Sequence, residues 1–136
     1  MMYVTRREHF SAGHRLYNPA WSDERNAEVF GKCNNPAGHG HNYYLEVTVA
    51  GDVDPETGYV VDLKQLKDVI QEYVLAKVDH KNLNEDVDFM RGVIPTAENI
   101  AIAIWKQLVH RIPQGRLHNV RLFETEKNIV DYRGEE

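Results

Sequence analysis

Disulfides, membrane spans and a secretory leader are all missing from this sequence. It contains a single cysteine, so no intramolecular disulfide can form. No apolar run approaches the roughly 20 residues that a helix needs to cross a bilayer. The first residues also lack the apolar region of a signal peptide. We therefore expect a soluble cytoplasmic protein with no membrane partner.

An excess of basic charge is missing as well. Lys and Arg number 16 against 21 Asp and Glu, for a net charge of -5. This balance argues against the broad phosphate contacts by which proteins hold nucleic acid. The chain has no internal repeat, no low-complexity tract and no linker rich in Gly, Ser or Pro. We expect its 136 residues to form one domain over residues 1–136, with a sizeable core.

The densest chemistry lies in residues 31–43, which hold the cysteine and two closely spaced histidines. If this segment enters a strand, the two-residue period puts His39 and His41 on one face, and Gly40 between them leaves room for an ion. Cys33 is far enough along the chain to loop back towards that ion without being a ligand itself. A thiol beside a metal suits base chemistry.

A third histidine, His14, follows the segment from Tyr3 to Phe10, whose aromatic and β-branched residues predict a strand. A lone histidine at a strand end is more often a surface or core residue than a ligand. Three neutral imidazoles with an open fourth position, however, form a known arrangement for catalytic zinc. Together with His39 and His41, His14 therefore indicates a metal site.

The rest of the pattern predicts an α+β fold. Period-two segments indicate strands, and apolar residues at helical spacing indicate helices. After the first strand we expect a functional loop over 15–30 with a short helix at 23–29, and then a hairpin of strands 43–49 and 59–61. Two helices follow, over 63–77 and from 96 to near 113. A hairpin of strands 117–125 and 129–133 closes the domain. Asp62, with Gln65 as its capping-box partner, and Thr96 are the expected helix caps. We expect an antiparallel sheet with two helices on one face, whose open edges favour an oligomer.

Three more polar residues stand at the ends of predicted elements. Asp79 and His80 directly follow a helix; such a pair is often solvated surface, but it also suits a base with its orienting carboxylate. Glu124 falls in line with the apolar Val120 and Leu122 of a strand. A carboxylate buried there without a partner is costly, so it stands at an exposed strand end or meets a cation or a group rich in N–H donors. A bound aminopyrimidine is one such group.

Several motifs, in order along nearly the whole chain, resemble the 6-pyruvoyltetrahydropterin synthase family. They are Phe10-Ser-Ala-Gly-His14, Gly31-Lys-Cys-Asn-Asn-Pro-Ala-Gly-His-Gly-His-Asn-Tyr43, Asp79-His-Lys-Asn-Leu83, Thr96-Ala-Glu-Asn99 and Phe123-Glu-Thr125. No single motif is decisive, but their joint occurrence is specific. The resemblance implies a tunnelling fold (T-fold) whose subunits join their sheets into a barrel. It also implies a homohexamer made of two trimers, with active sites at subunit interfaces.

The resemblance assigns the metal and the base. His14, His39 and His41 correspond to the zinc ligands of the family. Cys33 corresponds to its proton acceptor, which takes a proton from substrate carbon.

The resemblance also assigns the groups around the substrate. Asp79 and His80 correspond to the family's relay pair, and Glu124 to its pterin anchor. Thr96 and Glu98 would lie beside the pterin ring. All these positions hold the residue type that the family expects.

The implied reaction is a lyase reaction on 7,8-dihydroneopterin triphosphate. It eliminates inorganic triphosphate and redistributes hydrogens within the substrate, on the route to tetrahydrobiopterin. No nicotinamide or flavin is needed, and the sequence has no Gly-rich dinucleotide fingerprint. Mg²⁺ can accompany the triphosphate. Basic side chains such as Lys32 or Arg15 are candidates to meet it, and the sequence does not choose between them.

Two alternatives stay open. The sister activity, 6-carboxy-5,6,7,8-tetrahydropterin synthase of queuosine biosynthesis, shares the substrate, the zinc and the base. The five residues between Cys33 and His39 resemble the pyruvoyl-forming branch, since the carboxy-forming branch usually has three. A non-catalytic pterin-binding module is the other alternative, against which the intact Cys33, Asp79 and His80 argue. A zinc hydrolase is disfavoured because no His-Glu-x-x-His motif is present.

Overall fold

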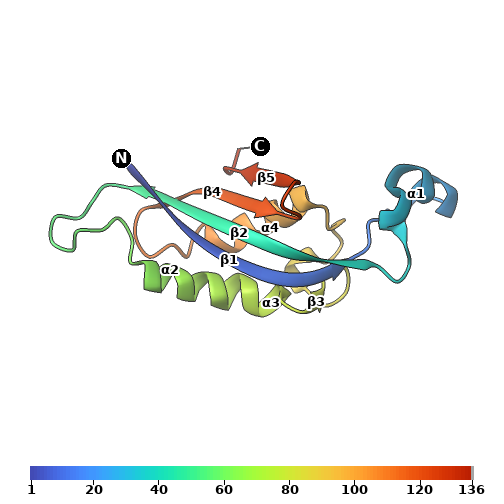
Figure 1. The fold of residues 1–136 in the computed structure, drawn as a ribbon, viewed down its shortest axis with the longest axis horizontal. Helices are drawn as coiled ribbons and strands as arrows, with labels where there is room; N and C mark the ends of the chain where they lie inside the picture. Colours follow the sequence, from blue (N-terminus) through green and yellow to red (C-terminus); the bar gives the residue numbers. More distant parts are fainter. Residues whose placement is uncertain (136) are drawn as a thin grey trace.

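Two long strands form the centre of the computed structural model, which describes residues 1–135. They are β1 (Met2–His14) and β2 (His39–Gly51), and they pair antiparallel along their whole length. The register places His14 opposite His39 at one end of the sheet (Figure 1). Both predicted strands are confirmed. Each runs further than its β-branched residues indicated, because the other strand supplies backbone partners up to its end.

The complete sheet has five strands in the order β3-β1-β2-β4-β5. The remaining strands are β3 (Lys81–Asn82), β4 (Arg116–Phe123) and β5 (Ile129–Tyr132). The hairpin of β4 and β5 was predicted and is confirmed. The short strand β3 was not predicted; it lies parallel to β1 beside Ala12 and Gly13.

The predicted strand over residues 59–61 is wrong. The chain makes bends there, and Val60 and Val61 insert into the core without joining the sheet. The reason is that β2 lies between β1 and β4, so neither of its edges is free for a hairpin partner.

Two helical segments cover one face of the sheet. The elements are α2 (Leu63–Ile70), the π-helical turn η2 (Gln71–Leu75) and α3 (Ala76–Val78), which follow one another without a break, and α4 (Ala97–Leu108). The first helix is confirmed, and the second ends earlier than the predicted limit near Pro113. A single 3-10 turn, η3 (Asp88–Met90), lies between them.

The helix caps are partly as predicted. Asp62 caps α2 by accepting a hydrogen bond from the Lys64 amide at 2.9 Å, and Thr96 caps α4. The expected capping box with Gln65 is wrong. The amide of Asp62 donates to the side chain of Gln114 at 3.1 Å, so the loop before β4 fixes the start of α2.

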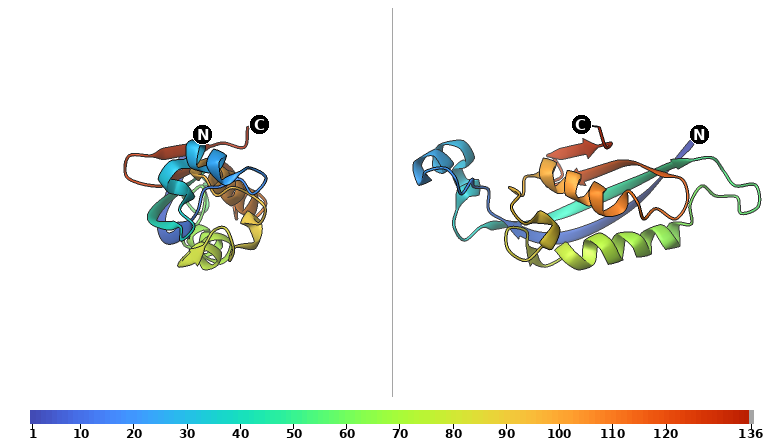
Figure 2. Two further views of the ribbon diagram at one scale, coloured as in Figure 1. Left: turned by 90° about the vertical axis from the view of Figure 1, so that its right-hand side faces the viewer. Right: turned by 180° about the vertical axis from the view of Figure 1, so that it is seen from behind.

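The core lies between the sheet and the two helices. Alternate β2 side chains point into it and are fully buried, namely Tyr43, Leu45, Val47 and Val49. Tyr44, with the opposite parity, is 43% exposed on the face that the helices leave open. Seen from behind, α2 and α4 lie side by side across the sheet (Figure 2). The predicted α+β arrangement with helices on one face is therefore confirmed.

A small arm projects beyond the end of β1 and β2 (Figure 1). It consists of α1 (Asp23–Phe30) followed by the 3-10 turn η1 (Gly31–Asn34). The short helix predicted at 23–29 is confirmed, and Trp21 stacks on Phe30 with ring centroids 5.9 Å apart. In the described part of the chain, no helix is long and apolar enough to span a membrane.

Candidate metal centre

Three histidines meet at the end of the β1–β2 pair. His14 comes from β1, and His39 and His41 come from β2. One ring nitrogen of each lies within 4.8 Å of the others. The predicted parity of His39 and His41 is confirmed, and the strand register supplies His14 from the neighbouring strand.

The ring of His14 is oriented by a backbone carbonyl. Its Nδ1 lies 2.8 Å from the carbonyl oxygen of Pro95, and because a carbonyl can only accept, Nδ1 must carry the proton. The lone pair is then on Nε2, which faces Nε2 of His39 at 3.1 Å. A hydrogen bond from the other ring nitrogen is the usual way to fix the tautomer of a metal-ligating histidine.

The surroundings favour neutral imidazoles. Burial lowers the pKa of His14, which is only 1% exposed, and it also lowers the pKa of His41. The carboxylate of Glu124 acts in the opposite direction on both, but more weakly than burial. Burial also raises the pKa of Tyr43, whose hydroxyl lies 3.4 Å from Nδ1 of His14. Burial therefore favours in His14 and His41 the neutral form that binds a cation.

The nitrogens of His14 and His39 have a spacing that suits a small tetrahedral cation. Zinc–nitrogen bonds of about 2.0–2.1 Å require ligand nitrogens roughly 3.3 Å apart in a tetrahedron. The 3.1 Å between the Nε2 atoms of His14 and His39 is close to this value. Three protein ligands leave the fourth position open, as in catalytic rather than structural sites. The chain therefore presents a centre suited to a metal ion and one exchangeable ligand.

Glu124 lies beside this centre, immediately after β4. Its amide donates to the carbonyl of Asn128 at 3.0 Å, which closes the turn to β5. The half-buried side chain lines a hollow of about 510 Å³ together with Thr96, Glu98 and Lys127. The charge of Glu124 acts on His14 and His41, so this hollow lies near the histidines. The structure thus brings Glu124, Thr96 and Glu98 together, and the strand-end position of Glu124 is confirmed.

Cys33 stands apart from the ligand set. It lies on η1, is half-buried, and does not belong to the group of ligand atoms formed by His14, His39 and His41. Its carbonyl accepts a hydrogen bond from the amide of Leu16 at 2.8 Å. The cysteine is therefore attached near the end of β1 without being placed as a fourth metal ligand.

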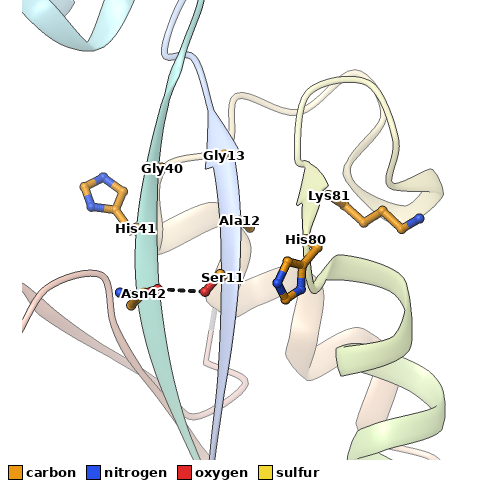
Figure 3. A pocket seen from close by; sticks show the side chains of 8 residues that line it. All are labelled: Ser11, Ala12, Gly13, Gly40, His41, Asn42, His80 and Lys81. Atoms are coloured by element: carbon orange, nitrogen blue, oxygen red, sulfur yellow. Dashed lines mark hydrogen bonds between the residues drawn. The ribbon is translucent and has the colours of Figure 1, made fainter.

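Asp79 and His80 lie at the edge of β1. The amide of Ser11 donates to Asp79 at 2.9 Å, and this bond, followed by the contact with His80 at 3.1 Å, lowers the pKa of Asp79. His80 has a φ of 60° and a side chain that is 82% exposed. In Figure 3 the ring of His41 points away from His80 on the far side of β2. A single chain thus leaves the pair outside the metal centre.

The edge next to His80 is hollowed. This hollow has a volume of about 370 Å³. Its lining residues are Ser11, Ala12, Gly13, Gly40, His41, Asn42, His80 and Lys81 (Figure 3). There the Ser11 hydroxyl of β1 donates a hydrogen bond to the side-chain oxygen of Asn42 on β2 at 2.7 Å. The orienting roles of the Ser11 amide and the Pro95 carbonyl could not be predicted from the sequence, because nearly every residue has these backbone groups.

The sequence matches the family described as 6-pyruvoyl tetrahydropterin synthase over residues 3–135. The chain belongs to this family. A 6-pyruvoyl tetrahydrobiopterin synthase of Poecilia reticulata is 51% identical over 133 residues, which are 98% of this chain and 90% of that protein. The solved structure of the Caenorhabditis elegans 6-pyruvoyl tetrahydropterin synthase superposes with a TM-score of 0.93 at 44% identity, and covers 98% of this chain and 96% of that one. The resemblance found in the sequence and the T-fold are thereby confirmed.

The sister branch of the 6-pyruvoyl tetrahydropterin synthase family is more distant. A putative 6-carboxy-5,6,7,8-tetrahydropterin synthase of Archaeoglobus fulgidus is 39% identical over 95 residues, which are 70% of this chain and 75% of that protein. The pyruvoyl-named protein of Poecilia reticulata is thus similar over more of the chain and at higher identity, in the direction that the spacing of Cys33 and His39 predicted.

Proposed function

We propose that this chain is a zinc-dependent 6-pyruvoyltetrahydropterin synthase. It converts 7,8-dihydroneopterin triphosphate to 6-pyruvoyltetrahydropterin and eliminates inorganic triphosphate, which makes it a lyase of tetrahydrobiopterin biosynthesis. The observation that carries the proposal is the convergence of three imidazoles beside the hollow that contains Glu124. The relative of that name whose sequence is 51% identical to this chain also supports it.

His14, His39 and His41 are the residues that would hold zinc. Zinc bound there supplies a Lewis acid that stabilises oxyanion charge on the substrate side chain and acidifies the neighbouring C–H bond. The Pro95 carbonyl keeps Nε2 of His14 directed at the centre. Because the burial of His14 disfavours protonation, the site stays competent for a cation near neutral pH.

Glu124 anchors the pterin. Its carboxylate accepts two N–H bonds from the aminopyrimidine edge, and such bidentate, charge-assisted bonds fix both position and orientation. Thr96 and Glu98 line the same hollow. In the proposed complex they contact the ring. The pterin side chain then extends towards the three histidines, so that binding energy from the ring is used to place the reacting carbons.

Cys33, Asp79 and His80 move the protons. Cys33 accepts the proton from the side-chain carbon, and His80, oriented by Asp79, exchanges a proton with a side-chain hydroxyl. The hydrogens lost from one carbon reappear elsewhere in the pterin, so no external reductant enters.

The place of Asp79 and His80 supports an oligomeric arrangement. Asp79 is bonded to the Ser11 amide of β1, and the ring of His41 points away from His80 in Figure 3, which supports a site completed by a neighbouring subunit. We assign a cytoplasmic homohexamer, a dimer of trimers with the sheets joined into a barrel, in which residues 1–136 form one pterin-synthase domain. Mg²⁺ accompanies the triphosphate.

The test is to incubate zinc-loaded protein with 7,8-dihydroneopterin triphosphate, follow triphosphate release and measure the mass of the pterin product, with Cys33→Ala as the control. A product that retains all three side-chain carbons as the diketone supports the proposal. A one-carbon carboxylate with loss of a two-carbon aldehyde would move the chain to the 6-carboxytetrahydropterin branch. Tight pterin binding without triphosphate release would leave a binding module.

A further inference from the structure

The turn that carries Cys33 is attached to the sheet by very few groups. It belongs to the arm that projects past β1 and β2, and α1 precedes it directly. Within residues 1–135, the hydrogen bonds that tie Gly31–Asn34 to the end of β1 come from Arg15 and Leu16. The position of the thiol relative to the histidines therefore depends on those two residues.

Leu16 contributes one backbone bond, from its amide to the carbonyl of Cys33 at 2.8 Å. A single bond fixes a distance but lets the turn pivot about it. Arg15 adds two bonds to the next residue: its Nε donates to the carbonyl of Asn34 at 2.8 Å, and a terminal nitrogen donates to the Asn34 side-chain oxygen at 3.0 Å. These two bonds remove the pivot, because a guanidinium donates in a fixed planar fork.

Arg15 is itself held rigidly. It directly follows the ligand His14, and its amide and carbonyl bind the side chain of Asn84 at 2.7 and 2.8 Å. Its guanidinium carbon lies 4.1 Å from the centre of the Tyr17 ring. No ion pair to a carboxylate is found for it within residues 1–135. The side chain is thus used to hold backbone and amide oxygens rather than to neutralise an acid.

We infer that Arg15 is a positioning residue, which fixes the Cys33 thiol against the metal-ligating end of β1 by holding Asn34. The catalytic role of the thiol in this inference rests on the proposed function. The contacts between Arg15 and Asn34 do not depend on it. Arg15 neither ligates metal nor takes a proton; it acts through Asn34. The interpretation differs from one in which Arg15 meets the triphosphate, because two of its five N–H groups, on Nε and on one terminal nitrogen, already donate to Asn34.

The test compares Arg15→Lys with wild type. Lysine keeps the charge and the length but loses the fork. As misplacing a catalytic group by about 1 Å can cost roughly 100-fold, we expect kcat to fall about 10- to 100-fold. KM and zinc content should stay unchanged. Because Cys33 is the only cysteine, the rate of alkylation by iodoacetamide reports on its environment alone, and we expect that rate to change in the metal-free as well as the zinc-loaded protein.

Two further variants make the result specific. Asn34→Ala removes one of the two acceptors, so its loss of kcat should be smaller, and the double variant should be no worse than Arg15→Lys alone because the pair acts as a unit. Asn34→Ala also keeps the test available if Arg15→Lys does not fold. Arg25→Lys is the matched control, since Arg25 also lies over an aromatic ring, that of Trp21, and is not bonded to Gly31–Asn34.

The outcomes separate the inference from the proposed function. Wild-type kcat and alkylation rate in a folded Arg15→Lys variant would overturn the inference. A raised KM with unchanged alkylation would instead make Arg15 a substrate contact, and loss of zinc would make it a support of the metal centre; either contradicts the inference. If wild type itself releases no triphosphate, the proposed function fails, while the alkylation rates still decide whether Arg15 positions Cys33.

Discussion

The three histidines and the cysteine lie at the same end of the molecule, but they are held in different ways. The histidines stand on two fully paired strands, and His14 is fixed further by the Pro95 carbonyl. Cys33 lies on a single 3-10 turn at the base of a projecting arm, attached through Arg15 and Leu16. The proposed metal ligands are therefore part of the sheet, whereas the proposed base lies on a segment attached to the end of the sheet.

This difference implies that metal binding and catalysis are separable. A rigid strand pair keeps ligand nitrogens at metal distances whatever the arm does. The thiol, by contrast, depends on side-chain bonds that single substitutions remove. Changes in the cluster should abolish both properties, and changes in the arm should abolish only the reaction.

Removing a ligand should have the largest effect. In His39→Ala two nitrogens remain, too few for tight zinc binding, and we expect loss of zinc with a fall in kcat of more than about 1000-fold. Metal analysis and triphosphate release measure the two properties. His110→Ala, which removes an exposed histidine after α4, is the control. A His39→Ala protein that retains one zinc per chain would show that the cluster is not the site.

Removing the base should have the next largest effect. We expect Cys33→Ala to lower kcat by about 100- to 1000-fold, within the range for a general base, while zinc content stays at the wild-type value. Cys33→Ser, which keeps the size but is a far weaker base, should behave similarly. Loss of zinc in Cys33→Ala would contradict the separation of the two regions.

Removing the charge of the pterin anchor should act mainly on substrate binding. Glu124→Gln keeps the shape but loses charge-assisted bonds worth about 1.5–3 kcal/mol, so kcat/KM should fall roughly 10- to 100-fold. Glu126→Gln, in the same turn but exposed, is the matched control. Unchanged kinetics in Glu124→Gln would place the pterin elsewhere.

The smallest expected effect is on stability, at Asp79. The Ser11 amide, followed by His80, lowers the pKa of this carboxyl below its ordinary value of 3.8. The folded state therefore binds the proton less readily than the unfolded state, so the carboxylate contributes stability that is complete above pH ~5 and is lost as pH falls through the folded pKa. Because the side chain is 42% exposed, Asp79→Asn should lower the free energy of unfolding at pH 7 by less than about 1 kcal/mol.

Urea unfolding at pH 7 and near pH 3 measures the effect at Asp79, with Asp88→Asn at a 94% exposed side chain as the control. The difference from wild type should shrink at the lower pH. A difference that grows on acidification would contradict the assigned direction of the pKa shift.

The sequence was sufficient to predict the strand pair that carries the histidines and the short helix of the arm, but not how the arm is attached to the sheet. The parity of His39 and His41 follows from the period of a strand, and the place of Glu124 follows from the alternation of β4. The strand over 59–61 could not be excluded from sequence, because only the pairing of β2 with both β1 and β4 removes its partner edge.

The supports of the site were also out of reach of the sequence. Pro95 orients His14 with a backbone carbonyl, a group that every residue has. The bonds from Arg15 to Asn34 join residues 19 positions apart, and no periodic pattern relates them. Such contacts depend on how the arm leaves the sheet, which only the three-dimensional arrangement determines.

The most direct test of the difference between the two regions is zinc K-edge X-ray absorption on the zinc-loaded wild-type protein. We expect three nitrogen scatterers and one oxygen scatterer at about 2.0–2.1 Å, and no sulfur. The spectrum of Cys33→Ala should be the same. A sulfur scatterer at about 2.3 Å in the wild type that disappears in Cys33→Ala would make the cysteine a ligand and contradict the account.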